Sequence, residues 1–330
     1  MNLHTLQIIL LSFLLLFYGC KKNNPVSVVD ESKGKIFVTA NVSGAEIFLD
    51  NISTGKFTPD TITAFATGYV VKVRKESFFS EKKRVIFDRY KTKTVKFELQ
   101  KNQLHKNVLL EYFPRNDTGN CINGNELISE LKDDFKDSLF LLNYTSLNLP
   151  PSNPFYFTLH QSIGYRMKNY NVLNTPIIII DGNKIQDFNN IEILKDKIKK
   201  GLHETTYFKL TVSDSILTAN GFKVTARLTV YDTDKLDFNS LVLHMVVFEK
   251  IPACTIDNGE TCGNVVRAML PSEYGRDLSA ISKKGLYNYY EYKLLNPDWK
   301  KLNLFVVAFV QNKLTNKIWQ VAKSEQNFWF

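Results

Sequence analysis

The chain has 330 residues, with 42 lysines and arginines against 33 aspartates and glutamates and a formal net charge of +9. Hydrophobic residues make up 44% and aromatic residues 13%, which is enough for packed cores and excludes a disordered, collagenous or coiled-coil chain. Four cysteines are too few for a fold built on disulfides, and five scattered histidines offer little for metal chemistry. The length predicts two or three domains.

The N-terminus carries a short apolar segment. Residues 6–17 (LQIILLSFLLLF) contain no charge, and this run is about half as long as a spanning helix, as in the core of a signal peptide. A small residue and then Cys20 follow, which resembles the lipobox of bacterial lipoproteins. The resemblance implies that residues 1–19 are a signal peptide and that Cys20 carries the lipid. The alternative is an uncleaved anchor with an incidental cysteine.

Residues 20–33 are polar and predict a tether, and residues 34–99 predict a small all-β domain. In the second segment apolar and polar residues alternate at period two between turn signals. Three stretches resemble the PEGA domain, a β-sandwich module of exported proteins: SGAEIFLD at 43–50, TGKFTP at 54–59 and GYVV at 68–71. The leading Pro-Glu of that family is absent. The resemblance implies no catalytic residues.

Residues 104–203 alternate between predicted strands and helices. In chain order we expect a strand at 108–113, a helix at 126–135, a strand at 139–142, a helix at 158–170, a hairpin at 177–185 and a helix at 191–198. This order is typical of a thioredoxin-like α/β domain. In that fold a cis Thr-Pro peptide faces the redox loop, and Pro176 is the candidate for it.

The redox motif of this segment is incomplete. Thioredoxin-like oxidoreductases use two cysteines, of which one attacks and the other resolves the mixed disulfide. Here Cys121 is followed by Ile-Asn-Gly, so a dithiol cycle within the motif is impossible. Cys121 is therefore a candidate for a one-cysteine reaction or a bond to another protein, and the alternative is an inert remnant.

Residues 205–330 return to strand patterns and predict a second β-sandwich. The stretches NVVRAMLP at 264–271 and LFVVAFVQN at 304–312, with Trp299 and KIWQ at 317–320, resemble the C-terminal domain of the Omp-twenty-eight-like family of outer-membrane lipoproteins. Members of that family join a thioredoxin-like domain to this sandwich. The resemblance implies location and architecture more than a reaction. The predicted fold class is therefore multidomain α+β, with a PEGA-like β-sandwich, a thioredoxin-like α/β domain and a C-terminal β-sandwich.

Two smaller groups of residues need an interpretation. Cys254 and Cys262 flank TIDNGET, and in an oxidising compartment they predict a disulfide that closes a hairpin. Zinc would need two further ligands, so we expect no metal site and no cofactor. Asp232, Asp234 and Asp237 lie between two predicted strands, where a solvated loop is the expectation.

The positive charge is concentrated in the predicted β domain. Residues 33–99 hold 13 basic and 7 acidic side chains, whereas residues 100–204 balance at 12 and 12. The excess gathers in a candidate basic patch, which consists of Lys72, Arg74, Lys75, Lys82, Lys83 and Arg84. Anionic lipid headgroups or acidic polysaccharide are the expected partners, and nucleic acid is not. The alternative is a merely solvated strand face.

These observations predict a non-enzymatic lipoprotein of the cell envelope. It would be attached to the outer membrane through Cys20, on the periplasmic or the outer side, and it would act as a binding or scaffold protein, with other envelope proteins as further partners. One alternative is a thiol-dependent oxidoreductase or chaperone-like protein that uses Cys121 opposite Pro176. A third interpretation, carbohydrate binding by the C-terminal sandwich, rests on analogy of fold alone. The sequence does not name the ligand.

Overall fold

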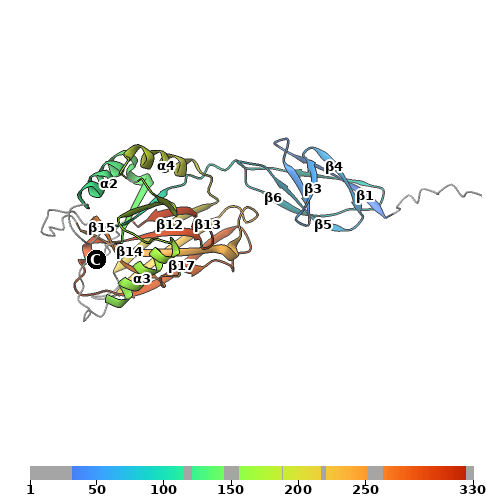
Figure 1. Ribbon diagram of the computed structural model, residues 1–330. Coiled ribbons are helices and arrows are strands. Elements are labelled where there is room, and N and C mark those ends of the chain that lie inside the picture. Colours follow the sequence, from blue (N-terminus) through green and yellow to red (C-terminus); the bar gives the residue numbers. More distant parts are fainter. Residues whose placement is uncertain are drawn as a thin grey trace, which may run out of the picture. The chain divides into compact units, whose positions relative to one another are not determined.

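The computed structural model describes residues 32–114, 121–144, 156–187, 189–216, 221–251 and 263–324. Contacts divide the chain into two compact units, the first ending at Leu99 and the second comprising Glu76–Ser80 and the chain from Gln100 onward. Strand predominates in both units (Figure 1). The α-helices of the described residues are α2 (Cys121–Phe135), α3 (Tyr156–Asn169) and α4 (Ile191–His203).

The first unit is built from two β-sheets. Its strands are β1 (Lys33–Ala40), β2 (Glu46–Leu49), β3 (Ile52–Phe57), β4 (Asp60–Phe65), β5 (Gly68–Arg74), β6 (Glu81–Ile86) and β7 (Thr92–Phe97). One sheet has the order β4-β1-β7 and the other the order β3-β2-β5-β6. Alternate residues such as Ile36, Val38, Val71 and Val73 are fully buried. The period-two pattern therefore places one face of each sheet in the core, and the small all-β unit expected from the sequence is confirmed.

The second unit contains a nine-stranded sheet and a three-stranded sheet. The large sheet is formed by β8 (Val108–Phe113), β9 (Leu139–Asn143), β10 (Ile177–Ile180), β11 (Asn183–Ile185), β14 (Leu241–Ile251), β15 (Gly263–Leu270), β16 (Arg276–Asp277), β18 (Leu304–Asn312) and β19 (Ile318–Lys323). Its order is β11-β10-β8-β9-β15-β14-β18-β19, with β16 paired to β14. The small sheet, β12-β13-β17, is formed by β12 (Phe208–Ile216), β13 (Gly221–Val230) and β17 (Gly285–Leu294).

The predicted fold class is wrong for this part of the chain. A separate thioredoxin-like α/β domain and a separate C-terminal sandwich were expected, but β8 to β11 do not form a sheet of their own. They continue into the C-terminal strands, because β9 runs parallel to β15 with Val265 opposite Asn143. The side-chain amide of Asn264 also donates to the carbonyl of Leu141 at 3.1 Å across this junction. The result is one β-rich unit with a continuous sheet.

The apolar cores show why the sheet is continuous. Leu109 and Phe113 of β8 share one buried cluster with Val246 of β14, Phe309 of β18 and Ile163 of α3. The other face of the large sheet packs against two separate apolar clusters. One cluster includes residues of β8, α2 and α4, and the other includes residues of β12, β13, β14 and β18. Buried residues from the strands of both halves of the large sheet, β8 to β11 and β14 to β16 with β18 and β19, therefore pack into one shared core.

The predicted Asp-Gly hairpin is confirmed between β10 and β11. Asp181 and Gly182 have φ angles of 48° and 86°, the left-handed conformation that a two-residue turn of this kind requires. A Cβ on Gly182 would lie 1.9 Å from the carbonyl oxygen of Asn316, so only glycine fits this close approach. The Thr175–Pro176 peptide is cis, as expected for Pro176.

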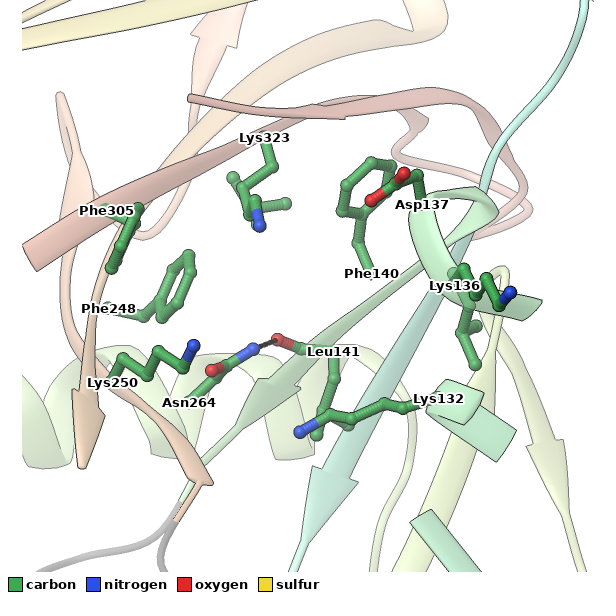
Figure 2. A pocket seen from close by; sticks show the side chains of 12 residues that line it. Lys132, Lys136, Asp137, Phe140, Leu141, Phe248, Lys250, Asn264, Phe305 and Lys323 are labelled. Carbon is green, nitrogen blue, oxygen red and sulfur yellow. Dashed lines mark hydrogen bonds between the residues drawn. The ribbon is translucent and has the colours of Figure 1, made fainter. Parts of the chain in front are cut away.

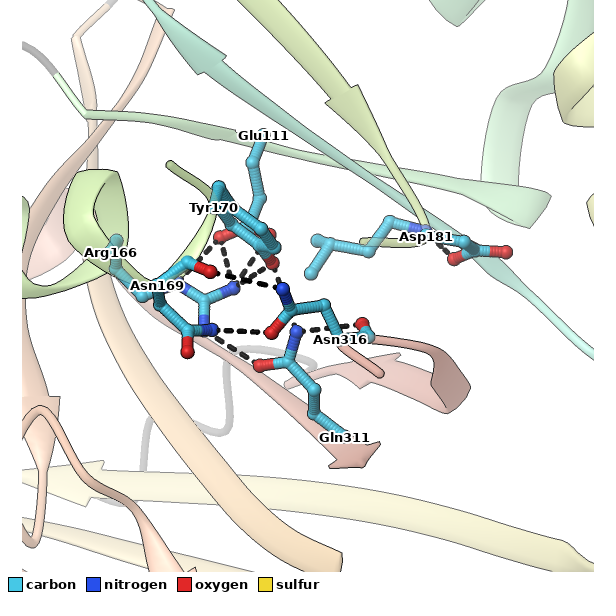
Figure 3. A network of polar contacts seen from close by, with 8 residues as sticks. Glu111, Arg166, Asn169, Tyr170, Asp181, Gln311 and Asn316 are labelled. Atoms are coloured by element: carbon cyan, nitrogen blue, oxygen red, sulfur yellow. Dashed lines mark hydrogen bonds and ion pairs between the residues drawn. The ribbon is translucent and has the colours of Figure 1, made fainter. Parts of the chain in front are cut away.

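A buried ion pair joins three elements of the second unit (Figure 3). Arg166 of α3 is fully buried, and its guanidinium donates to both carboxylate oxygens of Glu111 in β8 at 2.7 Å. It also donates to the side-chain oxygen of Gln311 in β18 at 2.7 Å, and the hydroxyl of Tyr170 contacts both charged groups. Burial lowers the pKa of Arg166, but the charge of Glu111, the neighbouring Tyr170 and Tyr144 and the hydrogen bond to Glu111 together raise it above its ordinary value. The guanidinium therefore keeps its charge inside the core.

Replacing Arg166 with methionine tests this ion pair. We expect the free energy of unfolding of R166M to fall by about 3–5 kcal/mol, because a buried carboxylate would lose its partner. Urea unfolding followed by tryptophan fluorescence measures the change. The double variant E111Q/R166M should recover part of the loss, since it also removes the stranded charge. K168M, at an exposed position of the same helix, is the matched control, and R166M as stable as K168M would contradict the role assigned to Arg166.

A second buried carboxylate lies between the sheets of this unit. Asp214 of β12 is 7% exposed and accepts a hydrogen bond of 2.9 Å from the hydroxyl of Ser324, directly after β19. Burial raises the pKa of Asp214 to about 6, and the Ser324 hydrogen bond only partly opposes that shift. Because the folded chain holds this proton more tightly than the unfolded chain, folding is favoured at low pH. The contribution is fully present below the unfolded pKa near 3.8 and is lost as the pH rises through about 6.

We therefore expect D214N to be more stable than the wild type at pH 7, by about 1–2 kcal/mol, since asparagine removes the cost of a buried charge. Chemical unfolding between pH 4 and pH 7 measures it. The difference should shrink as the pH falls toward 4, because Asp214 is then protonated in the folded chain and increasingly protonated in the unfolded chain as well. A stability difference that is unchanged over this range would contradict the assignment.

Candidate functional site

Most of the cysteine sites expected from the sequence lie outside the described residues. This holds for Cys20, Cys254 and Cys262, so lipid attachment and the disulfide stay predictions. Cys121 is the first residue of α2, and its side chain is likewise outside the description. A role of Cys121 opposite Pro176 therefore stays a prediction. Within the described ranges, none of the helices is both long and apolar enough to cross a membrane.

The predicted basic patch is divided between two faces of the first unit. Lys72 pairs with Lys82 and Val70 with Arg84 across β5 and β6, so Lys72, Arg74, Lys82 and Arg84 share the outer face of their sheet. We call these four residues the basic face. Lys82 and Arg84 are exposed, whereas Arg74 forms an ion pair of 2.8 Å with Glu46.

Two further members of the patch have structural contacts. Lys83 pairs with Val71, which places it on the inner face, and its amine donates to the carbonyl of Lys96 in the second sheet at 2.6 Å. Lys75 donates to the carbonyl of Ser43 at 2.6 Å. Both contacts hold main-chain segments of this unit. The alternation of a strand thus separates neighbouring lysines that the sequence suggested as one patch.

Two of the aspartates that follow β13 also form hydrogen bonds that stabilise the local structure. Asp232 is fully buried, and its carboxylate accepts hydrogen bonds from the backbone amide and the hydroxyl of Ser80 at 2.7 and 2.6 Å. Asp237 caps the backbone amide of Asn239 at 3.1 Å. The expectation of a solvated loop is therefore wrong for Asp232. Among the residues described, no group of three or more potential ligands from His, Cys, Asp and Glu is placed to hold a metal ion.

A cavity of about 240 Å³ lies where the two halves of the large sheet meet, and we call it the lysine pocket. It is lined by the end of α2, the turn after it, and strands β9, β14, β15, β18 and β19. Figure 2 shows the amines of Lys132, Lys250 and Lys323 directed into the same space, while the amine of Lys136 points away from it. Asp137 contributes the one carboxylate of this lining.

The three inward amines repel one another. Burial lowers the pKa of Lys132, and the positive charges of Lys250 and Lys323 lower it further. A cation that is partly withdrawn from water and faces two others raises the free energy of the empty pocket. A bound anion would relieve both effects, because it replaces lost hydration and offsets the repulsion. The lining of the pocket therefore carries an excess of positive charge.

Aromatic rings supply the walls of the pocket. Phe248 and Phe305 stack with their centroids 5.6 Å apart, and the amine of Lys323 lies 5.7 Å from the centroid of Phe305. Phe140 lies on the opposite side in Figure 2. Phe248 is buried in the cluster that also holds Leu142 and Val307, so this wall is held by the shared core. The cavity thus combines cations with apolar faces.

Sequence reasoning did not find this pocket. Lys132, Lys250 and Lys323 come from three distant parts of the chain, and each is unremarkable among its neighbours in sequence. The stretches around Asn264 and Phe305 were singled out only as a family resemblance. The side chains converge because β9 lies beside β15, and no local pattern encodes that pairing.

The comparisons with known proteins concern fold and domain type. No curated protein matches the chain. Among solved structures, HBP35 of Porphyromonas gingivalis is 19% identical and superimposes with a TM-score of 0.56, covering 70% of this chain and 81% of its own. This likeness is one of fold alone.

Two further structures match less well. A domain of the outer membrane lipoprotein Omp28 from P. gingivalis is 15% identical over 38% of this chain and 91% of its own, with a TM-score of 0.28. Protein AGR_C_4864 from Agrobacterium tumefaciens is 12% identical over 69% of this chain and 99% of its own, with a TM-score of 0.42. Both scores are too low to carry an inference about fold.

The clearest match is to a family model. Residues 33–103 match the PEGA domain, and they span the two sheets of the first unit. The identification of these residues from their three turn motifs is therefore confirmed: the N-terminal β unit of this chain matches the PEGA domain family.

Proposed function

We propose that this chain is a non-enzymatic binding protein of the cell envelope, whose second unit takes up a small acidic ligand in the lysine pocket. The observation that carries the proposal is the convergence of the Lys132, Lys250 and Lys323 amines on one aromatic-walled cavity. The PEGA match agrees with an envelope protein, because that module is typical of exported proteins. Lipid attachment at Cys20 belongs to the same proposal and rests on the sequence.

The pocket defines the chemistry of its ligand. Its volume of about 240 Å³ is below the roughly 300–1,000 Å³ usual for drug-sized ligands, so the ligand is small. The three inward amines favour a ligand with a phosphate, sulfate or carboxylate group. The stacked rings of Phe248 and Phe305 favour a ligand that carries an apolar or planar part beside its anionic group. An organic anion that joins both parts should bind better than either part alone.

Phenyl phosphate is a probe of this design. Calorimetry of the full chain should show tighter binding of phenyl phosphate than of inorganic phosphate or phenol. In the variant K132Q/K250Q/K323Q the affinity should fall about tenfold or more, because three charge contacts are removed. The free energy of unfolding should stay level or rise, since the same change removes the repulsion around Lys132.

The matched control is K197Q/K199Q/K200Q, which removes three exposed lysines of α4 and leaves the pocket intact. It should bind phenyl phosphate as the wild type does. Equal losses in the two variants would show that only overall charge matters and would overturn the pocket. A loss of stability in the pocket variant would instead make these lysines structural.

The basic face of the first unit has a separate proposed role at an anionic membrane surface. Lys82 and Arg84 are exposed on the same side of one sheet, and the buried Lys72 packs over the ring of Phe48 behind them, 4.7 Å from its centroid. In the sequence only the predicted tether of residues 20–33 separates the proposed lipid-attachment site from this unit. Exposed cations near anionic headgroups contribute about 1 kcal/mol each.

Vesicle partitioning tests this second role. The full chain should bind vesicles of phosphatidylcholine and phosphatidylglycerol better than vesicles of pure phosphatidylcholine. The ratio of the two partition coefficients measures the effect of vesicle charge, because a lipid anchor would insert into both kinds of vesicle. K82Q/R84Q should reduce this ratio about tenfold, because two surface cations are lost. K91Q/K93Q, which changes two exposed lysines elsewhere in the same unit, is the control. A ratio that is equal in both variants would contradict the role.

A further inference from the structure

The outer face of the small sheet is a second, independent surface of the second unit. Inward positions of its strands are buried in the core that they share with the large sheet, and outward positions follow from the register. We call the outward set the tyrosine face. It consists of Lys209, Thr211, Ser213 and Ser215 of β12, Lys223, Thr225, Arg227 and Thr229 of β13, and Leu286, Asn288, Tyr290, Tyr292 and Leu294 of β17.

Strand alternation divides the tyrosine-rich run of β17 into two sets. Tyr287 and Tyr289 pack against the core of the unit. Tyr290 and Tyr292 lie on the outer side, where 52% and 64% of their surface is exposed. The amine of Lys223 lies 5.3 and 5.9 Å from the centroids of these two rings, so one cation joins both. Aromatic residues are enriched at interaction sites relative to the rest of a protein surface.

The face carries one sign of charge. Lys209, Lys223 and Arg227 are its three charged positions, and the register places no carboxylate among the others. The nearest acidic residues of these strands point the other way. Asp214 is buried, and Glu291 forms an ion pair with Arg276. Hydroxyl groups of serine and threonine occupy most of the remaining outward positions of β12 and β13.

We infer that the tyrosine face binds an acidic polysaccharide. The apolar faces of sugar rings stack on exposed tyrosine rings, and sugar hydroxyls bond to serine, threonine and asparagine side chains. The acidic groups of the polymer pair with Lys209, Lys223 and Arg227. An extended polymer can contact the outward side chains of several strands at once, whereas the lysine pocket accommodates only a small ligand.

Charge argues against a second copy of this chain as the occupant. A symmetric dimer would place the same patch on both sides of the interface. Three cations would then face three cations, and the face holds no carboxylate to neutralise them. Like charges opposed in this way cost affinity. A polyanion removes this repulsion.

Polygalacturonate is the probe, and neutral dextran is its comparison. Calorimetry or affinity electrophoresis of the full chain should show binding of polygalacturonate, weakened by added salt, and little binding of dextran. Y290A/Y292A and K223Q/R227Q should each lower the affinity about tenfold, because each removes a different class of contact. Circular dichroism should show unchanged folding, since Tyr290 and Tyr292 are exposed.

Two control variants separate this face from the rest of the molecule. Y90A removes a tyrosine that is 69% exposed in the first unit, and K197Q/K199Q/K200Q removes three exposed lysines of α4, outside the tyrosine face. Both should bind polygalacturonate normally. Loss of binding in either control, no loss in Y290A/Y292A, or equal binding of dextran would overturn the inference. So would self-association, or binding to anionic vesicles in place of the polymer, that Y290A/Y292A abolishes.

Discussion

The ion pair between Glu111 and Arg166 is the constraint on which the second unit depends. Both side chains are withdrawn from water, so each is tolerable only while the other is in place. Arg166 sits on α3, Glu111 on β8 and the third partner, Gln311, on β18. Strands from the two halves of the unit are thereby fixed beneath one helix. Two hydrogen bonds between Asn169 and Asn316 tie the turn after β18 to the same helix, and the amide of Gln311 donates to the carbonyl of Asn316 within that turn.

This constraint accounts for the architecture that the sequence did not predict. Once β8 and β18 share one core, the strands between them in space, β9, β15 and β14, complete a single sheet. The lysine pocket opens at the junction of β9 and β15, with Phe248 and Phe305 on one wall and Lys132 near the end of α2. The pocket is therefore a consequence of fusing the halves. HBP35 of P. gingivalis shares the overall fold across the part of the chain that it covers.

Alternation along strands has a different consequence for the surface. In β6 it leaves Lys82 and Arg84 outside and turns Lys83 toward the second sheet. In β17 it sends Tyr287 and Tyr289 to the core and exposes Tyr290 and Tyr292. In a run of similar residues, some side chains thus contact the rest of the unit and the others are exposed to solvent. Register therefore decides which lysines and tyrosines can meet a partner.

The sequence by itself determined the local structure of this protein and the family of its N-terminal unit. Period-two and helical patterns, the Asp181-Gly182 turn and the PEGA motifs are encoded by neighbouring residues, so they were predictable. The partner of Glu111, the burial of Asp232 and the convergence of Lys132, Lys250 and Lys323 were decided only by the tertiary structure. Each depends on contacts between segments that lie 55 residues (Glu111 and Arg166) to 152 residues (Ser80 and Asp232) apart in the chain. Side-chain periodicity reports only local structure, so it carries no information about such contacts. The same reason explains the wrong fold class, because an order of strands and helices does not state where a sheet ends.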